Sequence, residues 1–190
     1  MKGEEMLFLL NLLTRVPDNR QLFFTPELAK ALVGLMKMGL VRLPPFGVDI
    51  KANNQEPDDK QVLQVLLANC LSIIMHFCSF GGTWARLDPE LFEYSYAASD
   101  REIANTVKQE LHRLGILNVI KGYLDHLAAV SVAQGGLQGS QSSFRLLLLN
   151  ALGSLLAHSH DMRGGIIQAA VLDSVVLCMG WPLAYQGRNE

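Results

Sequence analysis

The sequence is short of charge, and of positive charge in particular. Charged residues make up 18% of the chain, and 16 lysines and arginines are set against 18 acidic residues, for a formal net charge of −2. Proteins that bind nucleic acid phosphates or anionic membrane surfaces do so with a basic electrostatic field. Because this composition supplies no basic excess, we expect no nucleic acid partner and no anionic membrane partner.

Cysteine is scarce, and no apolar run is long without interruption. The three cysteines Cys70, Cys78 and Cys178 each lie in an apolar run, which favours reduced thiols in a core over a secreted disulfide framework. We therefore expect a cytoplasmic protein, with the nucleus as an alternative. The longest apolar stretches, 62–80 and 144–157, are broken by polar residues before they reach the ~18 residues of a membrane span, so none is expected.

Apolar residues at helical spacing are abundant. Hydrophobic residues make up 49% of the sequence, which excludes an intrinsically disordered chain. No segment has the two-residue alternation of a strand, so we predict an all-α protein. One helix is expected to begin at Thr25-Pro26 and to stop at Gly39, and another to begin at Ser99 and to stop at Gly115.

The chain contains an internal repeat. Residues 9–35 align with the segment from Leu152 onward at a constant offset and without a gap, so that Leu9 matches Leu152, Leu12 matches Leu155, Asp18 matches Asp161, Arg20 matches Arg163 and Leu32 matches Val175. A more divergent copy covers 66–74 and resumes at 114–124. Because one helical pair cannot bury both of its apolar faces, stacked copies are expected.

Segments rich in proline, glycine and polar residues separate the repeats. The expected organisation is a first, partial repeat at 1–42, a loop at 43–60, a second repeat at 61–132 with an aromatic insertion at 81–98, a flexible linker at 133–143, and a third repeat at 144–190. The incomplete first copy and the lack of a polar terminal helix suggest a fragment or short form of a longer solenoid, since terminal repeats need polar outer faces.

The run 150–157, followed by Asp161-Met162-Arg163 and then by 166–176, resembles an armadillo repeat. In that family a buried helix of the ALxxL kind precedes a turn, a helix with an arginine near its start, and a small-residue corner. Residues 8–35 resemble it too, with Asn11 where peptide-binding members place an asparagine. The resemblance, which shades into HEAT repeats, implies a right-handed α-solenoid of about three repeats. In style the degenerate repeats also resemble the rotatin-type scaffolds of the centrosome and cilium, which adds a centrosomal location as an alternative.

This resemblance implies a non-enzymatic scaffold that binds a partner helix or peptide, without a cofactor, a metal or a catalytic residue. The positions that match Asn11 are Ile73 and Ser154, so a full asparagine ladder is not expected. From helical periodicity we predict partner contacts at Asn11, Arg15, His76, Arg145, Asn150 and Ser154. Trp84 and Tyr94 in the insertion are expected either to pack on the body or to anchor a partner, because aromatic residues dominate binding hot spots.

Two other hypotheses follow from the same residues. His158, His160 and Asp161 indicate a small helical metal-dependent regulator or enzyme, because two imidazoles beside a carboxylate can reach one metal ion, although the four-ligand spacing of structural zinc is lacking. The simpler interpretation is an exposed turn capped by Asp161. Self-association through exposed solenoid ends is the other hypothesis. For the pair Asp125-His126 we expect solvated side chains rather than a general base.

Overall fold

The computed structural model describes residues 3–42, 59–78, 98–137, 139–157 and 159–179. Throughout these residues the regular structure is helical and contains no strand, which confirms the all-α prediction. The helices are α1 (Gly3–Thr14), α2 (Pro17–Phe23), α3 (Pro26–Arg42), α4 (Asp59–Cys78), α6 (Ala98–Arg113), α7 (Ile116–Gln134), α8 (Gly139–Leu156), α9 (His160–Gln168) and α10 (Val171–Cys178).

Local capping signals account for two helix ends. The backbone N–H of Leu28 donates to the Thr25 hydroxyl at 3.1 Å, so Thr25 caps the start of α3 as predicted. Gly115 adopts a left-handed conformation (φ 77°) between α6 and α7, which confirms the predicted stop there.

Other expected boundaries are wrong. α3 continues through Gly39 to Arg42, because Gly39 lies in the packed interior of the helix rather than at its end. α6 begins at Ala98, one residue before the expected Ser99. The expected linker 133–143 is helical at both ends. α7 extends to Gln134 and is followed by left-handed Gly135 (φ 70°), and α8 begins at Gly139.

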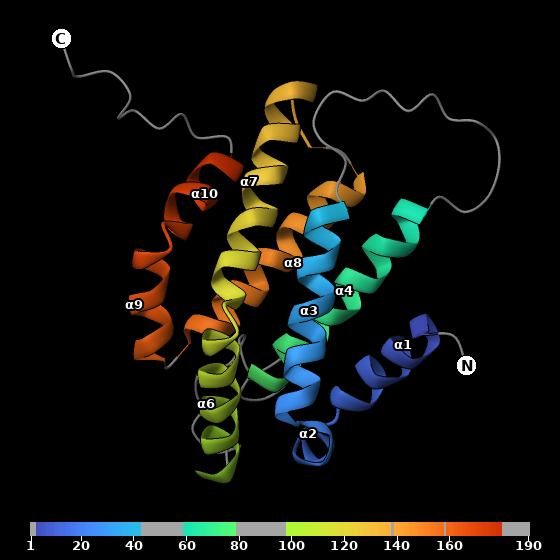
Figure 1. Ribbon diagram of the computed structural model, residues 1–190, viewed down its shortest axis with the longest axis vertical. Coiled ribbons are helices and arrows are strands. Elements are labelled where there is room, and N and C mark those ends of the chain that lie inside the picture. The colour runs from blue at the N-terminus through green and yellow to red at the C-terminus, as the bar shows by residue number, and fades with distance from the viewer. Residues whose placement is uncertain (1–2, 43–58, 79–97, 138, 158, 180–190) are drawn as a thin grey trace, which may run out of the picture.

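Six of the helices form two neighbouring rows. In the row that we call the α4 row, α4 packs between α1 and α8, and in the α3 row, α7 packs between α3 and α10. The rows meet where α3 contacts α4 and where α7 contacts α8. Figure 1 shows α3 and α7 in front of α4 and α8, with α1 at one side of the molecule and α10 at the other. The shorter helix α9 packs against α6.

A continuous apolar core fills the space between the two rows. Its fully buried members come from both rows and include Leu32, Met36, Leu71, Ile74, Ile120, Leu124, Leu148 and Leu155. Burial of one such side chain stabilises the fold by roughly 1.5–3 kcal/mol. By length and composition α7 could also cross a membrane, a criterion that a buried core helix meets as well. In this structure Ile116, Ile120 and Leu124 of α7 are buried in the core.

Gly39 allows α3 to approach its neighbours closely. A Cβ atom at this position would lie 2.6 Å from the Tyr123 hydroxyl oxygen and 2.7 Å from Leu67 Cδ2. The Tyr123 hydroxyl is held there because it donates to the Met36 carbonyl oxygen at 2.6 Å. The missing side chain of Gly39 therefore makes room for the contact of α3 with both α4 and α7.

Two glycines of α3 are expected to respond in opposite ways to alanine. Gly39→Ala should lower the free energy of unfolding by about 1–3 kcal/mol, because Tyr123 and Leu67 must move. Gly34→Ala should raise it by about 0.5–1 kcal/mol, because a Cβ there meets nothing within 4 Å and alanine favours the helix. Urea denaturation followed by circular dichroism measures both changes. A shift of both variants in the same direction would contradict the close packing at Gly39.

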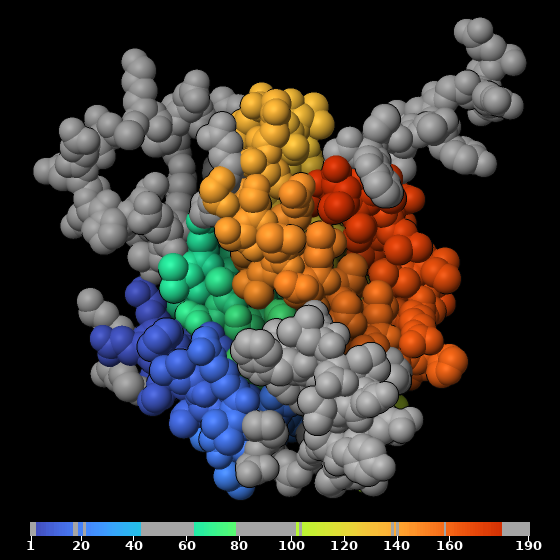
Figure 2. Space-filling view, turned by 180° about the vertical axis from the view of Figure 1, so that it is seen from behind, coloured from blue at the N-terminus to red at the C-terminus, as the bar shows by residue number. Residues whose placement is uncertain are grey.

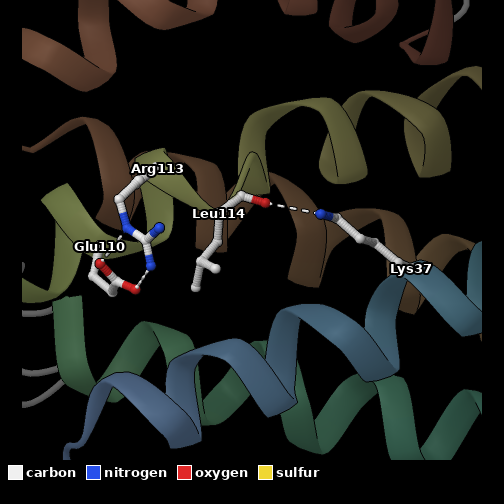
Figure 3. A network of polar contacts seen from close by, with 4 residues as sticks. All are labelled: Lys37, Glu110, Arg113 and Leu114. Carbon is white, nitrogen blue, oxygen red and sulfur yellow. Dashed lines mark hydrogen bonds and ion pairs between the residues drawn. The ribbon is translucent and has the colours of Figure 1, made fainter.

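Basic side chains donate to carbonyl groups at the C-terminal ends of helices, where four carbonyls lack partners within the helix. Figure 3 shows one case, in which Lys37 Nζ of α3 reaches the Leu114 carbonyl oxygen at 2.9 Å, beside the 2.5 Å ion pair of Glu110 and Arg113. Four further bonds of this kind are Arg20 Nε to Thr14 O (3.2 Å), Lys108 Nζ to Ala157 O (2.5 Å), Arg163 Nε to Leu156 O (3.2 Å) and Arg145 Nη1 to Cys178 O (3.0 Å). Five of the 16 lysines and arginines thus bond to helix ends distant from their own backbone or in a neighbouring helix.

Candidate functional site

The predicted partner-binding residues inside the described ranges belong to the α4 row. Asn11 lies on α1, and Arg15 directly follows the end of that helix. His76 lies near the end of α4, and Arg145, Asn150 and Ser154 lie on α8. Figure 2 shows α4 between α1 and α8 on the rear face of the molecule. Trp84 and Tyr94 lie outside the described residues, so their predicted roles stay predictions.

Two asparagines meet in the interface between α1 and α4. Asn11 Nδ2 donates to Asn69 Oδ1 at 2.7 Å, and both side chains are buried. The described residues supply no donor for Asn11 Oδ1. Sequence reasoning missed Asn69, although an asparagine within the apolar run of a helix is itself a signal, because a buried amide needs a polar partner.

A second polar contact joins the same two helices. The Thr14 hydroxyl donates to the Asn11 carbonyl oxygen at 3.2 Å, and His76 Nδ1 lies 3.0 Å from Thr14 Oγ1. Thr14 Oγ1 and His76 Nδ1 thus form a hydrogen bond between α1 and α4. Burial lowers the pKa of His76 to about 4, and the charges of Arg20 and Arg15 add to the effect. His76 is therefore a neutral imidazole at pH 7.

A stripe of small and apolar residues stays accessible on α4. Val65, Ala68, Ser72 and Met75 recur at helical spacing, and we call them the α4 stripe. Val65 is 57% exposed and the other three are half-buried, whereas the remaining sides of α4 are largely buried. The stripe belongs to the helix that packs between α1 and α8. Sequence reasoning missed it, because α4 is apolar almost all round and its periodicity does not reveal which side a neighbour covers.

The three predicted residues of α8 have different environments. Asn150 is exposed. Ser154 is buried and donates to the Asn150 carbonyl oxygen at 3.0 Å. Arg145 is half-buried, and its Nη1 reaches the last turn of α10 at the Cys178 carbonyl oxygen. Arg145 and Ser154 thus have internal partners, and Asn150 is the one of the three that solvent reaches freely.

The residues of the metal hypothesis are only partly described. His160 and Asp161 are exposed in the first turn of α9, while His158 lies outside the described residues. Asp161 does not cap this helix as expected: the cap is Ser159, whose hydroxyl accepts from the Met162 backbone N–H at 3.4 Å. Within the described ranges, no group of three His, Cys, Asp or Glu side chains could hold a metal ion. The set that includes His158 stays a prediction.

The remaining reactive groups are occupied in packing. All three cysteines are free thiols and buried, and burial raises the pKa of Cys70 and Cys78 to about 12, so neither forms a nucleophilic thiolate at neutral pH. Asp125 is not simply solvated as expected. It accepts from Ser174 of α10 and from Lys121, each at 2.5 Å, and so links α7 to α10.

Along the α4 row, the described residues combine a guanidinium at Arg15, a neutral imidazole at His76 and the α4 stripe. Such a set can recognise a partner by apolar contact framed by polar groups, which is the usual composition of a protein interface. No protein-family model matches this chain, and neither a curated protein nor a solved structure matches it.

Proposed function

We propose that this chain is a right-handed, armadillo-like α-solenoid of about three repeats and that it acts as a non-enzymatic, cytoplasmic protein-interaction scaffold. The helix contacts support this architecture: α1, α4 and α8 pack in succession, as do α3, α7 and α10, and α6 packs on α9. Stacked repeats that touch only their neighbours produce such rows.

Hydrogen bonds at matched positions support the repeat as well. Arg20 donates to a carbonyl at the end of α1, and its aligned partner Arg163 donates to a carbonyl at the end of α8. The aligned residues Val16 and Ser159 are the N-terminal caps of α2 and α9. The two arginines are aligned, and their acceptors Thr14 and Leu156 differ from the alignment by one residue. Aligned arginines that each bond the end of the preceding helix are expected when the two segments are copies of one unit.

The observation that carries the binding function is the α4 stripe. α4 packs against α1, α2, α3, α6 and α8, and yet Val65, Ala68, Ser72 and Met75 stay accessible along one side. A small-residue and apolar stripe flanked by other helices suits the apolar face of a partner helix, whose anchors recur at the same spacing. Arg15 beside this row favours a partner with an acidic residue.

Two exposed valines provide a matched test of this function. Val65→Glu puts a charge on the α4 stripe, and Val132→Glu puts the same charge on α7, at a side chain that is 86% exposed. Affinity capture from cell extract, quantified by mass spectrometry, should find partners held by the wild type and by Val132→Glu. We expect Val65→Glu to retain about tenfold less of them, because a buried charge without a counterion opposes binding.

Thermal unfolding of both variants serves as the folding control, and each should melt close to the wild type because both valines are exposed. Identical partner sets for Val65→Glu and the wild type would contradict the use of the α4 stripe. The proposal would also be contradicted if no captured partner bound Val132→Glu more strongly than Val65→Glu.

A further inference from the structure

The first helix has an apolar face with no partner among the described residues. Its inner face contacts α4 and is closed by Leu10, Asn11 and Thr14. The opposite side carries Phe8, Leu9 and Leu12, which are between 39% and 54% exposed. Their spacing puts these three residues on one side of the helix, and we call them the outer face of α1. Contiguous exposed apolar residues of this kind mark interaction sites.

The internal repeat indicates what this outer face is built for. At the constant offset of the alignment, Phe8, Leu9 and Leu12 match Ala151, Leu152 and Leu155 of α8. All three matched residues are buried in the core, and α8 packs against α4. In α8, the helix equivalent to α1, the matching residues are thus buried against other helices. The outer face of α1 has the same apolar character but stays exposed.

We propose that a second copy of this chain covers the outer face of α1, with the two α1 helices packed antiparallel. Charge favours this occupant and this direction. Glu5 lies toward the start of α1 on the side of Leu9 and Leu12, and Arg15 follows its end; both are exposed. In an antiparallel pair centred between Leu9 and Leu12, Glu5 of each copy comes close to Arg15 of the other. A parallel pair would bring like charges together instead.

Symmetry favours the same arrangement. The antiparallel pair uses one surface on both subunits and closes as a dimer, whereas stacking of α1 on the far end of another copy would continue into a filament. The dimer and the proposed binding function share Arg15, so other residues distinguish them. Val65 of α4 tests partner binding, and Leu9 and Leu12 of α1 test the dimer.

Analytical ultracentrifugation of the purified full chain tests the dimer. We expect a reversible monomer–dimer equilibrium with a dissociation constant on the order of 10–100 µM, because one helix pair buries less area than a standard interface. The double variant Leu9→Glu, Leu12→Glu should raise this constant about tenfold or more, since it brings four carboxylates into the contact. Val132→Glu is the matched control and should leave it unchanged.

A charge exchange tests the antiparallel direction. Glu5→Arg alone and Arg15→Glu alone should each weaken the dimer, because each variant pairs like charges at both ends of its homodimer. An equimolar mixture of these two variants should recover the wild-type affinity, because in the mixed dimer both ends pair opposite charges. A mixture as weak as the separate variants would overturn the proposal. So would a strict monomer at about 500 µM, or a dimer that Leu9→Glu, Leu12→Glu leaves intact.

Discussion

Replacement of Tyr123 by alanine is expected to lower the free energy of unfolding by about 3–5 kcal/mol. The side chain is buried, its hydroxyl donates to the Met36 carbonyl oxygen at 2.6 Å, and its ring packs edge-on against Phe144 with the centroids 5.6 Å apart. It therefore joins α7 to α3 and to α8, and its loss leaves a cavity where the two rows meet. Urea denaturation monitored by circular dichroism measures the change.

Tyr123→Phe separates the two parts of this effect. Phenylalanine keeps the ring and removes the hydroxyl, so the expected loss is about 0.5–1.5 kcal/mol, the net contribution of one hydrogen bond. If the phenylalanine variant were as unstable as the alanine variant, the hydrogen bond to Met36 would dominate and the packing argument would be wrong.

Lys108→Ala should cost about 2–4 kcal/mol, because it removes both a buried aliphatic stem and a charge-assisted hydrogen bond. Lys108 is fully buried on α6, and Nζ donates to the Ala157 carbonyl oxygen at the end of α8, at 2.5 Å. Burial lowers the pKa of this lysine. Its truncation leaves the end of α8 without that donor, and denaturation of the purified variant gives the cost.

Lys37→Ala is the matched control for this prediction. Lys37 also donates to a carbonyl beyond a helix end, that of Leu114, but the bond is exposed to solvent (Figure 3). Its loss should change stability by less than about 1 kcal/mol, because water replaces an exposed donor. Equal costs for the two lysines would show that burial does not set the value of these bonds.

Several features of the fold follow from short-range sequence signals. Thr25 predicts the start of α3 because a hydroxyl next to the first turn satisfies a backbone N–H within three residues. Gly115 predicts the end of α6 because it can adopt the left-handed conformation. Both interactions are complete within a few residues of chain, so a single sequence contains all the information that they need.

The candidate site was only partly predictable. Asn11, Arg15 and His76 were named from periodicity, and the structure brings them together where α1 meets α4. Their partners Asn69 and Thr14 were missed, because Asn69 is 58 residues from Asn11 and Thr14 is 62 residues from His76. Which side of α4 stays open also depends on where α1 and α8 pack, and the apolar composition of α4 alone does not distinguish its sides.

The sequence by itself determined the helical class, the buried thiols, the start of α3 at Thr25 and the end of α6 at Gly115, because these depend on composition and on neighbours in the chain. The tertiary structure alone decided that Gly39 lies inside a helix and that Lys108 is buried. Gly39 matches a stop signal locally, and only the approach of Tyr123 and Leu67 turns it into a packing residue. Lysine is normally exposed, and the carbonyl of Ala157, distant in sequence, accepts a hydrogen bond from the buried Lys108.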